Sequence, residues 1–182
     1  NISIFLEEYH INNSDENNKN DKITSNMINK IGHALHYKDE IFRQFTLENT
    51  LLGDIAEDLN LKNAVVPQSM YILKPAQIGG YVSPHCDNEF LFTSPKLSTL
   101  GMWFAIEDAT QKNGCLWTLP KSHIEQELKK KFISNGYSTS WQAIDPNDNI
   151  DTILKEEEVL YSNKLRNKEF IPLEAKQGTL VL

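Results

Sequence analysis

Hydrophobic and polar residues follow different patterns in the two parts of the chain. Residues 2–11 alternate with a period of two and are rich in β-branched and aromatic side chains, which predicts a strand. Over 23–37 the hydrophobic residues recur at four-residue spacing, which predicts a helix. Two further helical stretches are predicted over 40–45 and 51–59. The first third of the chain is therefore expected to be mainly helical.

Beyond residue 64 the chain consists of short apolar or alternating runs that Pro, Gly, Asn and Asp separate. Many short strands with frequent turns favour an antiparallel sandwich or barrel. We therefore expect a mainly β fold with helices (α+β), in one domain over 1–182, with a helical N-terminal layer. The segments 122–135 and 151–166 are predicted to be long connections or small helices. The runs predicted as strands are 64–74, 79–85, 89–93, 98–106, 115–120, 168–175 and 178–182.

Composition narrows the class of protein. The net charge of −7 argues against a protein that binds duplex nucleic acid, which needs a basic face. No apolar run approaches the ~20 residues of a membrane helix, and no signal peptide is evident at the N-terminus. Cys86 and Cys115 are too few for a disulfide scaffold and suit a reducing compartment. We expect a cytoplasmic protein, with a peroxisomal location left open, that binds neither nucleic acid nor membrane and is a monomer.

The stretch Ser-Pro-His-Cys-Asp at 83–87 holds the candidate chemistry. If a strand ends here, His85 and Asp87 lie on one face, because side chains two apart on a strand point the same way. Two histidines and one carboxylate that leave open positions suit non-haem Fe(II). A solvated turn is the alternative. A dyad of Cys86 with His85 is rejected, because neighbours on a strand point to opposite faces.

The surroundings favour a metal site. Gly79 and Gly80 allow close backbone approach to a bound group, and Pro84 stiffens the entry to the histidine. Met70, Trp103 and Trp117 on neighbouring predicted strands offer the apolar lining of a dry pocket. The remaining histidines have structural explanations: His10, His33, His36 and His123.

Several longer stretches resemble the phytanoyl-CoA dioxygenase family. They are 29–36, 68–74, 79–93, 100–110 and 113–123, about half of the chain, in the family's order and with similar separations. The resemblance implies a double-stranded β-helix (a jelly roll of the cupin kind) that binds Fe(II) and 2-oxoglutarate and activates dioxygen.

Carried over position by position, the resemblance makes His85 and Asp87 two ligands of the metal and the catalytic pair. It implies that the third ligand, a histidine, and an arginine for 2-oxoglutarate lie beyond Leu182. Arg43 and Arg166 stand in the wrong places to replace that arginine. The chain is therefore expected to lack both its N-terminal start and its C-terminal end. The residues that the resemblance assigns to cofactor and co-substrate are Lys30, Met70, His85, Cys86, Asp87 and Trp103.

The function implied is a dioxygenase that hydroxylates a small organic substrate, releases succinate and CO2, and uses ascorbate as its reductant. Asp87 argues for oxygenation, because relatives that halogenate have a small residue at this position. Two alternatives stay open: 2-hydroxylation of a branched acyl-CoA thioester, and a module that binds 2-oxoglutarate or metal without turnover. Two arginines and the acidic balance make a coenzyme A phosphate site less attractive, although the 16 lysines leave it possible.

Overall fold

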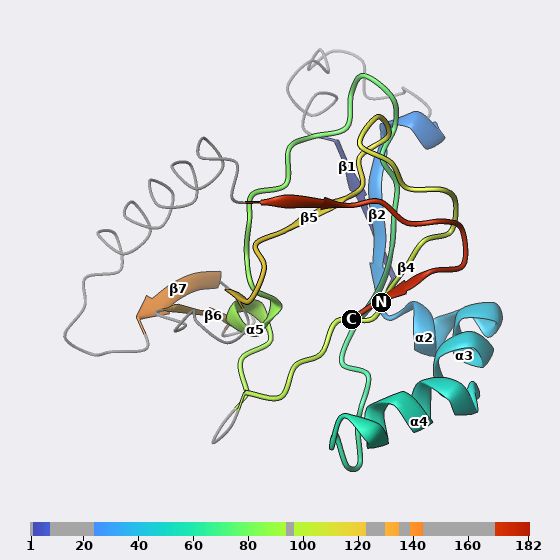
Figure 1. Cartoon of the computed structure of the whole chain (residues 1–182). Coiled ribbons are helices and arrows are strands. Elements are labelled where there is room, and N and C mark those ends of the chain that lie inside the picture. Colours follow the sequence, from blue (N-terminus) through green and yellow to red (C-terminus); the bar gives the residue numbers. More distant parts are fainter. Residues whose placement is uncertain (1, 8–23, 94–96, 123–129, 135–138, 144–169) are drawn as a thin grey trace. The chain divides into compact units, whose positions relative to one another are not determined.

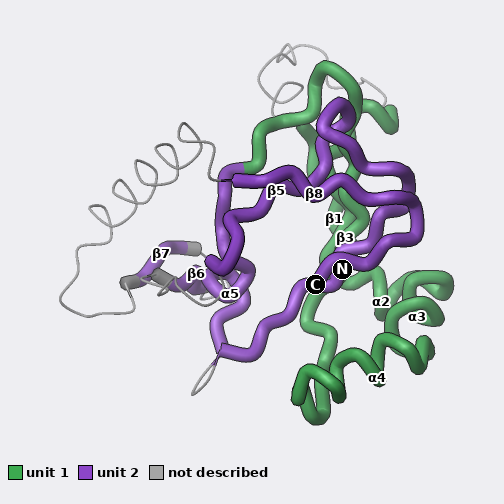
Figure 2. The backbone as a smooth tube through the Cα atoms, in the orientation of Figure 1, with its two compact units in different colours: residues 1–82 green, residues 83–182 purple. Residues whose placement is uncertain are grey.

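The structure is a computed structural model, and it describes residues 2–7, 24–93, 97–122, 130–134, 139–143 and 170–182. The chain divides into two compact units, 1–82 and 83–182, which Figure 2 distinguishes by colour. The expectation of a single domain stays a prediction.

The first unit contains a three-stranded antiparallel sheet with the strand order β1-β2-β3. Its central strand is β2 (Ile28–His33), which pairs with β1 (Ser3–Leu6) on one edge and with β3 (Ser69–Ile72) on the other. β1 lies inside the predicted strand 2–11, and β3 inside the run 64–74. Strands from both ends of this unit therefore meet on β2.

The helix predicted over 23–37 is wrong for most of its length. A short 3-10 turn, η1 (Ser25–Met27), leads into β2, and only α2 (Leu35–Lys38) is helical. Ile and Met at four-residue spacing also suit a strand, and β2 forms hydrogen bonds on both of its edges. Tertiary pairing of this kind overrides local periodicity.

The other two predicted helices are confirmed, and each begins at a side-chain cap. Asp39 Oδ1 accepts hydrogen bonds from two backbone N–H groups at the start of α3 (Glu40–Leu47), at 3.0 and 3.1 Å. Asn49 Oδ1 accepts one at 3.1 Å at the start of α4 (Thr50–Asp58). Figure 1 shows α2, α3 and α4 in succession. The buried apolar residues of the first unit are Leu35, Leu52 and Ala56.

In the second unit, two distant segments run antiparallel along each other. Trp103 pairs with Val181, and an isolated bridge joins Ala109 to Ala175, in the same register. A turn at 111–114 then shifts the register before the next pair of strands. The strands involved are β4 (Trp103–Phe104) with β9 (Leu180–Val181), and β5 (Leu116–Thr118) with β8 (Ile171–Leu173). The buried apolar residues of this unit are Ala105, Cys115 and Phe170.

The second unit also contains a helical turn, α5 (Asp87–Phe90), and a hairpin of β6 (Lys130–Ser134) and β7 (Thr139–Ala143). α5 lies against β6. No strand forms over 79–85 or 89–93, so the two strands predicted there are wrong. Instead, the chain turns into α5.

The segments 122–135 and 151–166 were predicted to be connections or small helices. In the first, 130–134 form β6, whereas 123–129 and 135 lie outside the described residues. The second lies wholly outside them.

The described strands form one three-stranded and three two-stranded antiparallel sheets, accompanied by short helices. The α+β class is therefore confirmed. Among the described strands, these sheets do not join into a closed jelly roll. None of the helices in the described part of the chain combines the length and the apolar character that a membrane crossing requires.

Candidate functional site

The side chains of His85 and Asp87 approach each other at the start of the second unit. His85 Nε2 lies 3.6 Å from Asp87 Oδ1, and the two side chains are 39 % and 61 % exposed. Bonds from nitrogen or oxygen ligands to a divalent metal are about 2.0–2.2 Å long, so two ligands of one cation lie within about 4.2 Å of each other. The separation of the two atoms therefore fits a shared cation.

The second nitrogen of His85 determines which atom is available to a metal. Nδ1 lies 2.8 Å from the backbone oxygen of Ser83. Because a carbonyl oxygen only accepts hydrogen bonds, Nδ1 carries the proton and donates it. In the neutral ring Nε2 then holds the lone pair, on the side that faces Asp87. A hydrogen bond from the other ring nitrogen to a carbonyl is the usual way in which proteins orient a metal-binding histidine.

The pair converges by a different route from the one that the sequence predicts. His85 lies outside regular structure, Cys86 is the N-cap residue of α5, and Asp87 is its first residue. A turn into a helix, and not the alternation of a strand, therefore brings the carboxylate back toward the imidazole. Cys86 is half-buried and is not joined to Cys115 in a disulfide.

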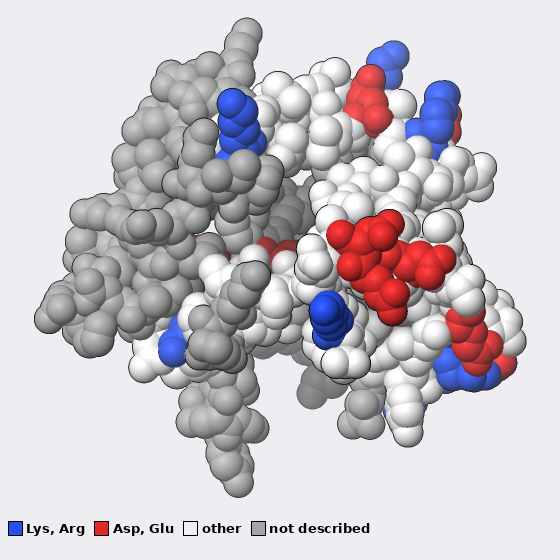
Figure 3. Space-filling model, turned by 60° about the horizontal axis from the view of Figure 1, so that its bottom comes forward, with Lys and Arg blue, Asp and Glu red and all other residues white. Residues whose placement is uncertain are grey.

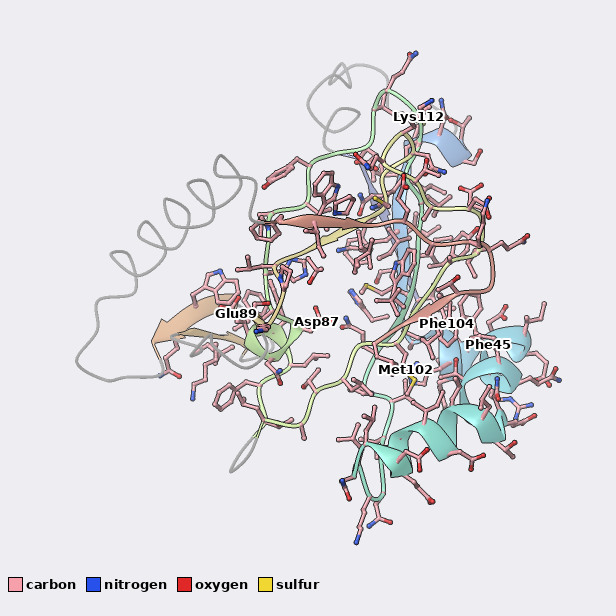
Figure 4. The ribbon with its side chains drawn as sticks, viewed as in Figure 1. Phe45, Asp87, Glu89, Met102, Phe104 and Lys112 are labelled. Carbon is pink, nitrogen blue, oxygen red and sulfur yellow. The ribbon has the colours of Figure 1, made fainter. Side chains whose placement is uncertain are left out.

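α5 also carries a second carboxylate. Glu89 is only 2 % exposed, whereas Asp87 is open to solvent. Figure 4 labels both residues on this single turn. Residues two apart on a helix lie on nearly opposite sides, which explains why one is buried and the other is exposed. The buried Glu89 therefore stands away from the face that carries the candidate metal ligands.

A glycine leaves space for the Asp87 carboxylate. A Cβ added at Gly101 would lie 3.1 Å from Asp87 Oδ2, closer than ordinary van der Waals contact. Trp103, the first residue of β4, follows two positions later and is half-buried. Trp103 is predicted to contact 2-oxoglutarate, and the segment that contains it passes close to Asp87, the predicted metal ligand.

The other two predicted co-substrate residues share one face of the sheet in the first unit. Lys30 lies opposite Ile72, and Met70 lies opposite Gly32. Residues two apart on a strand face the same side, so the lysine and the methionine are diagonal neighbours. A Cβ at Gly32 would lie 2.8 Å from Met70 Cγ, so this glycine makes room for the methionine. The Lys30 ammonium lies 5.1 Å from the centre of the Phe5 ring.

The described residues contain no cluster of three or more His, Cys, Asp or Glu side chains arranged to hold a metal. Among the described residues, His85 and Asp87 would therefore be only part of a ligand set. Arg43 lies on α3, where its ion pair with Glu40 (2.7 Å) and its contact with Glu48 raise the pKa of the guanidinium. Arg166 lies outside the described residues.

The remaining histidines are consistent with structural roles where they are described. The backbone N–H of His36 donates to Ser69 Oγ at 2.8 Å, and its Nδ1 lies at the same distance from that hydroxyl. The ring of His33 packs 5.2 Å from that of Phe5. His10 and His123 lie outside the described residues.

Sequence reasoning missed three features around the pair: the Ser83 carbonyl, Gly101, and Phe90, whose ring lies 5.5 Å from the His85 ring at an angle of 84°. A glycine within an apolar run signals close approach by another group, so Gly101 offered a usable signal. The other two contacts have no sequence signature. Trp117, predicted to line the pocket, is 52 % exposed on β5.

The charges at the surface reflect the acidic composition. In the view of Figure 3, several acidic side chains form one large patch and others lie in smaller groups, and Lys and Arg side chains stand in small separate groups. α4 contributes three exposed acidic residues, Asp54, Glu57 and Asp58. A polyphosphate such as that of coenzyme A is held by clustered cations. Among the described side chains of this face, cations do not cluster in that way.

Comparison with known proteins identifies the family. The family described as phytanoyl-CoA dioxygenase (PhyH) matches residues 6–182. The chain is 42 % identical over 155 residues to "Phytanoyl-CoA dioxygenase 1" of Oryza sativa subsp. japonica, which covers 85 % of the chain and 48 % of that protein. It is 39 % identical over 158 residues, with the same coverage, to "Phytanoyl-CoA dioxygenase domain-containing protein 1" of Mus musculus. The chain spans about half the length of these curated relatives. With a match over nearly its whole length, the chain belongs to the phytanoyl-CoA dioxygenase family.

Proposed function

We propose that the protein is an Fe(II)- and 2-oxoglutarate-dependent dioxygenase that hydroxylates a small organic substrate and releases succinate and CO2. The observation that carries the proposal is the pairing of His85 Nε2 with Asp87 Oδ1, 3.6 Å apart. Membership of the family supports the proposal, as does the word dioxygenase in the names of the rice and Arabidopsis thaliana relatives.

In this proposal His85 and Asp87 hold the metal together with a second histidine from outside the described residues. When bound, Fe(II) and 2-oxoglutarate supply the oxidising chemistry with dioxygen. The Ser83 carbonyl keeps the proton of His85 on Nδ1, so Nε2 stays available as a ligand. Asp87 would offset one of the two positive charges of the metal and would act as a ligand where halogenating relatives have a small residue. The reaction is therefore assigned as oxygenation.

The residues proposed to contact 2-oxoglutarate are Lys30 and Met70 in the first unit, and Cys86 and Trp103 in the second, and each is proposed separately. The Lys30 ammonium suits a carboxylate of 2-oxoglutarate, and the thioether and indole suit its methylene groups. The arrangement of β2 and β3 supports a joint role for Lys30 and Met70, because they are diagonal neighbours on one face. Substitution of each residue tests its own assignment, through the concentration of 2-oxoglutarate that gives half-maximal succinate release.

We also propose that the second unit belongs to a jelly roll. The support is the long antiparallel pairing of 103–109 with 175–181, which continues after a turn as β5 with β8. Pairing between segments that lie some seventy positions apart is typical of jelly rolls and not of simple hairpins. A structure of the whole protein in which these strands join two facing sheets would support the assignment, and an open arrangement would contradict it.

The test of function compares matched histidine substitutions in the whole protein. His85→Gln removes the proposed ligand, and His36→Gln changes a histidine that bonds to Ser69 in the first unit. Anaerobic titration with Fe(II) should show one site in the wild type and in His36→Gln, and its loss in His85→Gln. In air, with 2-oxoglutarate and ascorbate, only the first two proteins should release succinate.

Two results would contradict the proposal in different ways. Equal Fe(II) binding by wild type and His85→Gln would remove His85 from the metal site. The protein could instead bind Fe(II) and 2-oxoglutarate but release no succinate, even when candidate small acids and acyl-CoA thioesters are added. That result would favour a binding module. Asp87→Ala tests the second proposed ligand, because an enzyme of the proposed type should then lose both metal binding and succinate release.

A further inference from the structure

Phe90 is the side chain that the structure places directly against the His85 imidazole. The two ring centres are 5.5 Å apart, and the planes meet at 84°, which is a favourable edge-to-face arrangement. The Ser83 carbonyl restrains one nitrogen of the imidazole, but His85 itself lies outside regular structure. The contact with Phe90 supplies the second restraint that fixes the direction of the ring.

One turn of helix therefore serves both members of the candidate metal pair. α5 begins with Asp87 and ends with Phe90. Its first residue offers a carboxylate, and its last offers the ring that packs on His85. A single turn is too short to be stable in isolation, because helix nucleation is unfavourable. Something outside α5 must hold Phe90 in place.

The β6–β7 hairpin provides that support. Phe132 on β6 and Trp141 on β7 are directly paired across the hairpin, so they lie on the same face. Their ring centres lie 5.3 Å from each other, and 5.8 Å and 5.0 Å respectively from that of Phe90. Three mutually contacting aromatic rings form a rigid group, and the His85 ring packs against one of them, Phe90.

Phe90 contacts both the His85 ring and the two aromatic rings of the hairpin. It is therefore the side chain through which the hairpin can affect His85.

We infer that Phe90 is a positioning residue for His85 and that the β6–β7 hairpin sets its place through Phe132 and Trp141. The inference rests on the proposed function, because it assigns an effect on the same metal site. In this arrangement Phe132 and Trp141, which lie about fifty positions beyond His85 in the sequence, affect the geometry of a proposed metal ligand. Loss of a partner that orients a ligand typically lowers metal affinity by 10–100-fold.

The test uses Co(II) as the probe, with the whole protein. Phe90→Leu should weaken Co(II) binding about tenfold and change the visible spectrum of the bound ion. Phe90→Tyr, which keeps the ring, should restore both. Phe45→Leu is the matched control, because Phe45 is a phenylalanine of equal exposure (44 %) in the first unit. This control should bind Co(II) like the wild type.

The hairpin is tested by the pair Trp141→Phe and Trp141→Leu. The first keeps an aromatic ring and should retain affinity, whereas the second should weaken Co(II) binding in the same direction as Phe90→Leu. An NMR measurement without metal gives an independent readout. The ring protons of His85 should lose the ring-current shift from Phe90 in Phe90→Leu and not in Phe45→Leu.

The outcomes distinguish failure of the inference from failure of the proposed function. If Phe90→Leu binds Co(II) as the wild type does while His85→Gln does not bind it, the positioning role is overturned and the metal site stands. If wild type and His85→Gln behave alike, the proposed metal site fails, and the NMR result alone decides whether Phe90 orients His85. Unchanged His85 ring shifts in Phe90→Leu overturn the inference in either case.

Discussion

The substitution Gly101→Ala separates metal affinity from stability. The new Cβ would lie 3.1 Å from Asp87 Oδ2, whereas ordinary contact begins at 3.4 Å, so the carboxylate must move by at least 0.3 Å. Asp87 is 61 % exposed and can yield, so the cost in folding free energy is small. The backbone of Gly101 does not require a positive φ. The alanine should therefore stabilise the protein by about 0.4–1 kcal/mol through the unfolded state.

Metal binding should respond in the opposite direction. Ligand distances in metal sites hold within about 0.2 Å, so a displacement of 0.3 Å exceeds the tolerance. We expect Gly101→Ala to weaken Co(II) binding about tenfold, which corresponds to about 1.4 kcal/mol. Isothermal titration measures the affinity, and urea denaturation of the metal-free protein measures the stability.

The control for this substitution is Gly53→Ala. A Cβ at Gly53 meets nothing within 4 Å, and the residue lies inside α4. This variant should gain about 0.5–1 kcal/mol of stability with unchanged Co(II) affinity. If Gly101→Ala shows the same combination, then Asp87 is not held against Gly101 as a metal ligand, and the reasoning is refuted.

Two further predictions concern carboxylates elsewhere. Glu7 is buried, and its two oxygens each accept a hydrogen bond, one of them from Gly80 N–H at 3.0 Å. Glu7→Gln places an amide N–H against one of these donors and should lower the free energy of unfolding by about 1–3 kcal/mol. Urea denaturation measures this change. A change no larger than that caused by the exposed Glu40→Gln would contradict the prediction. Asp108 accepts from Lys176 Nζ at 2.6 Å, which lowers the pKa of its carboxyl below 3.8. The ion pair of Asp108 therefore contributes to stability above about pH 3.8, and this contribution is lost as the pH falls through the lowered pKa. In Lys176→Met, NMR titration should show a higher pKa for Asp108 than in the wild type.

The helices whose signals are local could be predicted from the sequence. α3 and α4 begin after Asp39 and Asn49, residues whose side chains cap helix N-termini, and both helices formed where their hydrophobic spacing indicated. β2 did not follow its own spacing, because it gains hydrogen bonds from β1 and β3. The partner strands lie tens of positions away along the chain, so a local pattern does not reveal them. β6 and β7, in contrast, pair with each other in a local hairpin, and this pairing was not predicted.

In the candidate site, too, the sequence predicts the local features and misses those that come from distant segments. His85 and Asp87 could be paired from the sequence because the chemistry of an imidazole and a carboxylate two positions apart is local. The predicted mechanism of convergence was a strand, and the observed one is the turn into α5. Ser83 and Phe90, which contact His85, lie in the same short segment. The groups next to Asp87 and Phe90 come from elsewhere in the sequence: Gly101 from the approach to β4, and Phe132 with Trp141 from the hairpin. No periodicity within 83–90 encodes them.

If a cation binds His85 and Asp87 as proposed, α5 and that cation should stabilise each other. Cys86, the N-cap residue of α5, makes no capping hydrogen bond through its side chain, so the turn begins without the usual support. Asp87 at the first position interacts favourably with the helix dipole, but its charge also attracts any cation that binds. A cation held by His85 and Asp87 ties the residue before the turn to its first residue. Since a ligand that binds only the folded form stabilises it by about 2.7 kcal/mol at a hundred times its dissociation constant, metal binding and the order of α5 are thermodynamically linked. The aromatic contacts of Phe90 act at the other end of the same turn, so both of its ends are held by partners outside the helix.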